Sequence, residues 1–136
     1  MPPFIAQKLA LARRQLHSAR NNASQGDIET AANRAFLAAE NAAAAAIAKS
    51  GRRARPVHAQ IRTDFEDLCD RGLIPRTFRN LLTESYGLRL RADYGRRIHG
   101  GRTIPELTPG SVRKIIERVD RLIDIVTRTP NPRLRS

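Results

Sequence analysis

The sequence predicts an all-α protein folded as an up-and-down antiparallel bundle of four to five helices. Hydrophobic residues make up 40% of the 136 residues but aromatic residues only 4%, so the core must be built from leucine, isoleucine, valine and alanine. Five segments repeat apolar residues at helical spacing, and no segment alternates convincingly between apolar and polar residues. A chain of this length is typical of one domain with one core.

The first two helices are expected over about residues 3–22 and 27–50. Prolines suit the start of the first helix, because the first helical turn does not use its N–H groups. A turn containing Gly26 separates the two helices, and Gly51 is the glycine that commonly follows a helix end. The alanine run at 42–46 gives the second helix a thin surface. Such a surface permits close helix–helix approach, either inside the bundle or across a dimer interface.

The third and fourth helices are expected over about residues 57–71 and 76–94, with Gly72 ending the third and Pro75 starting the fourth. The segment 96–107 is expected to be a loop. The glycine pair within it is expected to be its flexible point.

The fifth helix is expected to begin after Thr108, whose hydroxyl can cap it, with Pro109 in the first turn. Its strong apolar stripe fades at Arg128. Residues 1–127 are therefore expected to form the bundle. The basic tail 128–136 contains two prolines and is expected to be disordered.

The charge balance points to a polyanionic partner. The chain has 25 basic and 13 acidic residues, a net charge of +12, and all but three of the basic residues are arginine. Arginine binds phosphate through a bidentate fork of N–H donors. RNA, DNA or an acidic protein is the natural partner for such a chain. Arginine is, however, spread along the whole sequence. The alternative is therefore that the arginines reflect a general compositional bias and lie on a solvated surface without binding a partner.

Other classes of protein are disfavoured. Cys69 is the only cysteine, which excludes an intramolecular disulfide, and its place on an apolar face predicts a buried, inert thiol. The three histidines lie at no metal-ligand spacing, so no zinc site and no cofactor are expected. No apolar run is long enough to span a membrane, and no signal-peptide pattern is present. A cytoplasmic protein is expected.

A polar cluster lies near the end of the fourth predicted helix. Arg89 and Asp93 are four residues apart and share one helical face, with Arg91 and Tyr94 beside them. The cluster is expensive to bury and unnecessary on a plain surface helix, so it suggests a site. The alternative is a structural Arg–Asp pair that locks neighbouring helices. Tyr94 could equally cap the helix end or bond to Asp93.

This cluster carries a family resemblance. Arg89-x-x-Ala92-Asp93-Tyr94, preceded by Asn33-Arg34-Ala35-Phe36 and by His58, resembles a subgroup of the small prokaryotic HEPN proteins. The resemblance extends over about residues 10–126. It implies an up-and-down four-helix bundle with an added helix, and a homodimer that brings two copies of the motif together. It also implies metal-independent RNA cleavage, in which a ribose 2′-hydroxyl attacks the adjacent phosphodiester.

The resemblance also implies roles for residues and partners. HEPN nucleases commonly carry an arginine, then four to six residues, and then a histidine. Here Asp93 stands four residues after Arg89, one residue before the first position for that histidine, Tyr94 follows it, and His99 lies outside the spacing. The subgroup shares the aspartate. Many HEPN proteins are encoded with a nucleotidyltransferase antitoxin, and in such pairs the toxin can be modified on a tyrosine near its motif. Tyr94 is the residue in that position.

Two functions are therefore expected from different classes. The first is a toxin-like, metal-independent endoribonuclease acting as a homodimer. The alternative is a non-catalytic nucleotide- or nucleic-acid-binding module, or an adaptor for a nucleotidyltransferase. The candidate catalytic residues are Arg89, Asp93, Tyr94 and His58. The candidate RNA-binding residues are Asn33, Arg34, Arg52, Arg53, Arg55, Arg91, Arg96 and Arg97.

Two of these residues have structural alternatives. Arg34 lies mid-helix on or beside the apolar face, where a buried cation would need an anion such as Asp93 or Glu40. His58 lies in the first turn of its helix, where histidine is often only a surface residue.

Overall fold

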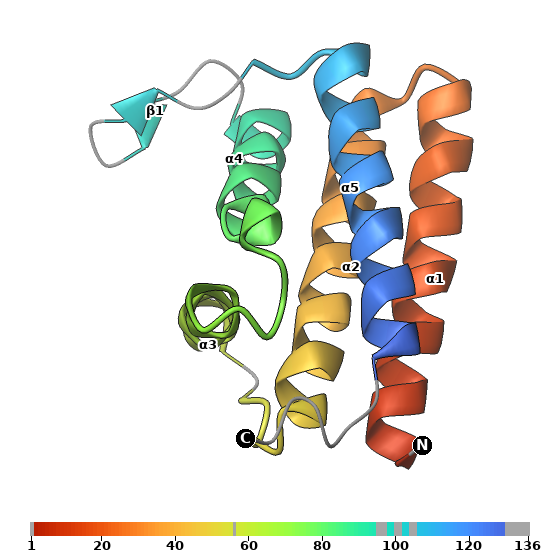
Figure 1. Ribbon diagram of the computed structural model, residues 1–136. Coiled ribbons are helices and arrows are strands. Elements are labelled where there is room, and N and C mark those ends of the chain that lie inside the picture. The colour runs from red at the N-terminus through yellow and green to blue at the C-terminus, as the bar shows by residue number, and fades with distance from the viewer. Residues whose placement is uncertain (1, 56, 95–97, 100–101, 104–105, 130–136) are drawn as a thin grey trace.

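Four helices of the computed structural model lie side by side, and another helix crosses them, seen end-on in Figure 1. The structure describes residues 2–55, 57–94, 98–99, 102–103 and 106–129. For residues 93–94 and for the two short strands it describes the backbone alone. The helices are α1 (Pro3–Ser24), α2 (Ile28–Lys49), α3 (His58–Asp70), α4 (Leu81–Tyr94) and α5 (Pro109–Arg128). The prediction of an all-α bundle with an added helix is confirmed.

Local sequence signals fix where the long helices begin. The Asp27 carboxylate accepts a hydrogen bond from the Thr30 backbone N–H at 3.2 Å and so caps α2. At the start of α5, the Thr108 hydroxyl accepts from the Ser111 N–H at 3.0 Å, and the Ser111 hydroxyl accepts from the Thr108 N–H at 2.9 Å. This reciprocal pair is a capping box, and it confirms the cap predicted at Thr108.

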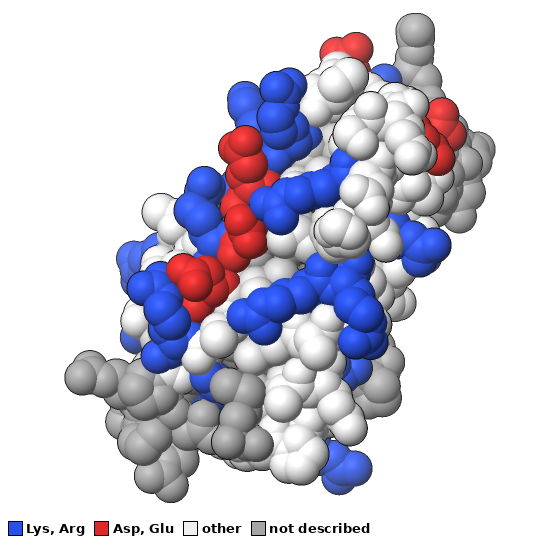
Figure 2. Space-filling view, turned by 90° about the vertical axis from the view of Figure 1, so that its right-hand side faces the viewer, with Lys and Arg blue, Asp and Glu red and all other residues white. Residues whose placement is uncertain are grey.

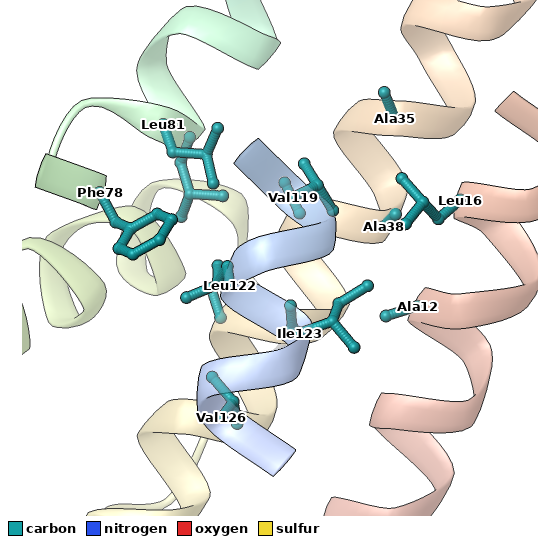
Figure 3. Packing of buried hydrophobic residues seen from close by; sticks show 14 of the residues in the cluster. Ala12, Leu16, Ala35, Ala38, Phe78, Leu81, Val119, Leu122, Ile123 and Val126 are labelled. Atoms are coloured by element: carbon teal, nitrogen blue, oxygen red, sulfur yellow. The ribbon is translucent and has the colours of Figure 1, made fainter. Parts of the chain in front are cut away.

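The core lies where α2 meets α1, α4 and α5. The alanines at 42–46 are all buried within the chain, which supports the intramolecular alternative for this thin surface. Larger side chains of α5 fill the space that the alanines leave. Figure 3 shows Ile123 of α5 pointing toward Ala12 of α1, with Leu16 and the alanines of α2 close by. Close packing of small against large side chains holds these three helices together.

A buried lysine joins the end of α2 to the end of α5. The Lys49 ammonium donates hydrogen bonds to the backbone carbonyls of Val126, Thr127 and Thr129 at 2.5, 3.2 and 2.7 Å. These carbonyls include groups that a helix C-terminus leaves without a partner. Burial lowers the pKa of the Lys49 ammonium below its ordinary value. The cation and the negative end of the α5 dipole attract each other.

Two expected boundaries were wrong. The fourth helix begins only at Leu81, because Arg76–Phe78 form a separate 3₁₀ turn, η1, directly after Pro75. Part of the expected loop is a hairpin, in which β1 (Ile98–His99) pairs antiparallel with β2 (Arg102–Thr103). The sequence between these strands is Gly-Gly, a common two-residue hairpin connection, and this signal was overlooked. In the tail expected to be disordered, residues 130–136 lie outside the described residues.

In the part of the chain that the structure describes, no helix is both long and apolar enough to cross a membrane.

Candidate functional site

The candidate site lies where α2, α3 and α4 meet, to the left of the bundle in Figure 1. Each helix contributes residues spaced three or four apart, which places them on one face. Phe36 and Glu40 come from α2, His58 and Arg62 from α3, and Tyr86 from α4. Since α3 crosses the bundle, its first turn brings His58 back to α2. The site is thus built on helical scaffold and not on loops.

His58 is held by a buried carboxylate. Its ring Nδ1 hydrogen-bonds to Oε2 of Glu40, whose side chain is 10% exposed, whereas the His58 side chain is 65% exposed. A carboxylate can only accept, so Nδ1 carries the proton and the other ring nitrogen, Nε2, keeps its lone pair in the neutral form. The Glu40 carboxylate therefore selects the tautomer of His58. The arrangement fixes an imidazole with one nitrogen free to exchange protons.

Phe36 is the centre of the cluster. Its ring is nearly buried, at 2% exposed. The His58 and Tyr86 ring centres lie 5.9 Å and 5.5 Å from it, both in tilted arrangements. The Arg89 guanidinium carbon lies 5.1 Å from the same ring centre, a cation–π contact. The structure thereby brings together two predicted catalytic residues, His58 and Arg89, around one aromatic ring.

A pocket of about 150 Å³ opens beside this cluster. Seven side chains line it: Phe36, Glu40, His58, Ala59, Arg62, Leu82 and Tyr86. Most of its wall is apolar, with Glu40, His58 and Arg62 as polar groups. The combination of an apolar wall, a paired imidazole and nearby guanidinium groups is suited to a phosphate ester with a flat organic group attached.

The other predicted catalytic residues lie at the end of α4. Asp93 and Tyr94 belong to its last turn, and Asp93 is four residues after Arg89. Their side chains are outside the described residues, so a direct Arg89–Asp93 contact stays a prediction. Arg91 is half-buried in the same helix.

The predicted RNA-binding residues do not all gather at the pocket. Asn33 shares the face of α2 that carries Phe36 and Glu40, and is half-buried. Arg34 lies on another face and is exposed, so the structural alternative in which it is buried beside an anion is wrong. Glu40, one of the anions considered for it, pairs with His58 instead.

Three arginines of the α2–α3 connection behave differently from one another. Arg52 hydrogen-bonds to Asp67 of α3, and Arg55 lies 3.4 Å from Asp64. Arg53 between them is exposed. The Arg52 guanidinium lowers the pKa of the Asp67 carboxyl below its ordinary value, and Arg71 adds to the effect. Arg96 and Arg97, also predicted to bind RNA, lie outside the described residues.

Charge on the opposite side of the bundle is mixed. Figure 2 shows the face on the right of Figure 1, where α1 runs, and acidic side chains lie there among the basic ones. Arg20 of α1 pairs with Asp120 of α5 at 3.0 Å, and Arg128 pairs with Asp124 at 2.7 Å. This face therefore does not present an uninterrupted basic surface to a polyanion.

Cys69 is chemically quiet, as expected. Its side chain is fully buried in α3. Burial raises the pKa of the Cys69 thiol to about 11, and the neighbouring Asp70 carboxylate adds to the effect. A thiol in this state is protonated near neutral pH and is a poor nucleophile. Among the described residues, no group of histidine, cysteine, aspartate and glutamate side chains could hold a metal ion.

Sequence reasoning missed three residues of this site. Glu40 stands at the edge of an alanine run and was considered only as a partner for Arg34. Arg62 and Tyr86 were not singled out at all. Helical spacing carried the signal: Glu40 is four residues after Phe36, Arg62 four after His58, and Tyr86 three before Arg89.

The chain belongs to the HEPN family. Residues 7–129 match the HEPN domain, which is nearly the whole of the chain. No curated protein is similar enough to count as a match. Membership of the family supports a nucleic-acid-related function, and HEPN domains commonly dimerise and bind RNA.

Proposed function

We propose that this protein is a metal-independent endoribonuclease whose active site is the pocket between α2, α3 and α4. The Glu40–His58 pair is the observation that carries the proposal. The α4 segment that begins at Arg89 has no histidine at the spacing usual in HEPN nucleases. His58 of α3 supplies a histidine that can transfer protons in its place. Arg62 lines the same pocket as His58, and Arg89 contacts the Phe36 ring that His58 also faces, so their guanidinium groups are proposed to hold a phosphodiester.

The proposed reaction uses the free nitrogen of His58. Nε2 accepts the proton of a ribose 2′-hydroxyl, and the 2′ oxygen forms a bond to the adjacent phosphorus. The bond between that phosphorus and the 5′ oxygen of the next nucleotide breaks, and this leaving oxygen takes a proton from the imidazolium or from water. The products are a 2′,3′-cyclic phosphate and a 5′-hydroxyl end. The Glu40 carboxylate stabilises the imidazolium formed on the way.

Arginine supplies the electrostatic part of the mechanism. The guanidinium groups of Arg89 and Arg62 are proposed to stabilise the negative charge that develops on the phosphoryl oxygens. The contact with the Phe36 ring restricts where the Arg89 guanidinium can lie. Asp93, at the end of the same helix, is proposed to orient Arg89.

The remaining predicted residues are proposed to extend the RNA contact beyond the pocket. Arg91 and Tyr94 lie on α4, two and five residues after Arg89, and Asn33 lies on the pocket side of α2. The more distant contacts would engage the phosphate backbone and would carry no sequence preference. They are Arg34, Arg52, Arg53, Arg55, Arg96 and Arg97.

Cleavage of total RNA and transfer RNA by the purified protein in EDTA tests the proposal. We expect cleavage by the parent protein and by His17→Ala, an exposed histidine of α1, but not by His58→Ala or Arg89→Ala. Circular dichroism would confirm that each variant is folded. Salt-sensitive RNA binding without cleavage would overturn the nuclease proposal in favour of a binding module, and cleavage abolished by EDTA would overturn the metal-independent mechanism.

We also propose a toxin–antitoxin setting with a nucleotidyltransferase partner, in which the toxin acts as a homodimer. The resemblance of the segment at Arg89–Tyr94 to such toxins supports this proposal, as does the tendency of HEPN domains to dimerise. Induced expression should arrest bacterial growth, and Arg89→Ala should relieve the arrest. Growth that continues during expression of the parent protein, with the protein soluble and abundant, would contradict the toxin role.

A further inference from the structure

We infer that the pocket between α2, α3 and α4 is a subsite for the base of a single pyrimidine nucleotide in single-stranded RNA. The inference rests on the proposed ribonuclease function and adds a substrate preference to it. It is carried by the size of the pocket, by the aromatic and apolar groups that line it, and by the place of His58 at its wall.

The size of the pocket fits one ring. Its volume is about 150 Å³. An apolar cavity of about 150 Å³ is enough to hold one benzene molecule. Uracil and cytosine are single six-membered rings, whereas adenine and guanine carry a second, fused ring. The pocket therefore encloses one six-membered ring, whereas the second ring of a purine would have to project through its open side.

The lining matches a flat, partly apolar group. Phe36 and Leu82 are each 2% exposed and form a closed apolar floor. The rings of His58 and Tyr86 lie on the same pocket and are tilted by 48° and 50° to the Phe36 ring. Bases pulled out of a single strand commonly stack on such aromatic side chains, whereas a base-paired duplex cannot present one.

The Glu40 carboxylate, on one wall of the pocket, can accept a hydrogen bond from a base. One oxygen of the Glu40 carboxylate is bonded to His58, and a carboxylate has capacity to accept further hydrogen bonds. Both pyrimidines carry a donor on their pairing edge, N3–H in uracil and the N4 amino group in cytosine. The Glu40 side chain is buried among apolar groups, which strengthens any such hydrogen bond.

His58 links the subsite to the point of cleavage. Because its ring lines the pocket, a nucleotide whose base enters the pocket brings its own ribose close to the same imidazole. The 2′-hydroxyl of that nucleotide is the one deprotonated in the proposed reaction. Cleavage is therefore expected on the 3′ side of pyrimidines.

Binding of mononucleotides to the full chain tests the subsite without any need for cleavage. Titration calorimetry would compare 3′-UMP and 3′-CMP with 3′-AMP, 3′-GMP and inorganic phosphate. We expect the pyrimidine nucleotides to bind about ten-fold more tightly than the purine nucleotides. Ala59→Leu places extra volume at the pocket wall and should reduce pyrimidine affinity to that of inorganic phosphate. Ala10→Leu, an equally exposed alanine on α1, is the matched control and should bind as the parent does.

A parallel cleavage assay on polyuridylate and polyadenylate separates this inference from the proposed function. Preferential cleavage of polyuridylate supports both. Equal cleavage of the two polymers with equal mononucleotide binding would contradict the pyrimidine subsite but not the ribonuclease function. Pyrimidine-selective binding with no cleavage of either polymer overturns the ribonuclease and leaves the subsite standing. Ala59→Leu with unchanged pyrimidine affinity, while folded, overturns the placement of the base in this pocket.

Discussion

Glu40 of α2 and His58 of α3 are 18 residues apart in the chain, yet the carboxylate of the first accepts a hydrogen bond from the imidazole of the second. The contact closes the α2–α3 connection and fixes the first turn of α3 against α2. It also joins a nearly buried anion to an exposed ring, so the ring is held without being enclosed. This combination suits a group that must exchange a proton with a large substrate.

The carboxylate of Glu40 is expected to matter more for the rate of cleavage than for the fold. In Glu40→Gln the side chain keeps its shape but no longer carries the charge that stabilises an imidazolium. We expect kcat to fall about 10²-fold or more, with thermal stability near that of the parent. Single-turnover cleavage at saturating enzyme would measure the chemical step. Glu40→Gln cleaving at the parent rate would show that the pair serves only to dock α3.

Arginines of the α2–α3 connection are expected to differ in their contribution to RNA binding. Arg52 is engaged by Asp67, whereas Arg53 is exposed. Each phosphate contact with a single strand contributes about 0.7 to the slope of log affinity against log salt. Arg53→Gln should therefore reduce that slope by about 0.7, and Arg52→Gln by less.

Filter-binding titrations with a single-stranded RNA over a range of salt would measure these slopes. Arg121→Gln, at an exposed position of α5, provides the control and should leave the slope unchanged. A larger change for Arg52→Gln than for Arg53→Gln would refute the ranking.

The free energy of unfolding is expected to fall at acid pH, partly because the Asp67 carboxylate becomes protonated. Its pKa is lowered by the Arg52 guanidinium first and by Arg71 as well. Because the folded pKa lies below the ordinary value of 3.8, the ionised carboxylate stabilises the fold fully above that value. The contribution is lost as the pH falls through the lowered pKa.

Urea unfolding of the parent and of Asp67→Asn would test this dependence. The parent should be the more stable at about pH 7, and the difference should shrink as the pH falls below 3.8. Glu106→Gln, at an exposed position, controls for the loss of a negative charge. A difference that grows toward acid pH would contradict the assignment.

Much of the fold could be predicted from the sequence, because an apolar stripe at helical spacing reports directly on the buried face of a helix. Thr108 marked the start of α5 because its hydroxyl caps the helix, and Gly51 marked the end of α2 because it adopts a positive φ. The site could be predicted only in part. Arg89 was identified from its helical spacing to Asp93 and His58 from a family resemblance. Glu40 was not identified, since its role depends on α3 crossing back over α2. That crossing is a tertiary arrangement which no local pattern encodes.

Lys49 is expected to stabilise the end of α5. Its ammonium donates to the backbone carbonyls of Val126, Thr127 and Thr129. Lys49→Met keeps most of the side-chain volume but removes the donors, so the free energy of unfolding should fall by about 1–3 kcal/mol. Chemical denaturation would measure the loss, with Lys114→Met on the exposed side of α5 as the control. Equal stability of the parent and Lys49→Met would show that water satisfies these carbonyls as well as Lys49 does.

In the proposed reaction His58, held by Glu40, removes the proton from a ribose 2′-hydroxyl. The most direct test of this step is a DNA oligonucleotide with one internal ribouridine, incubated in EDTA with the parent protein and with His58→Ala. We expect a single cut after the ribouridine by the parent, leaving a 2′,3′-cyclic phosphate identified by mass spectrometry, and no cut by the variant. An equal cut by folded His58→Ala, or a cut by the parent in the all-DNA oligonucleotide, would contradict the proposed reaction.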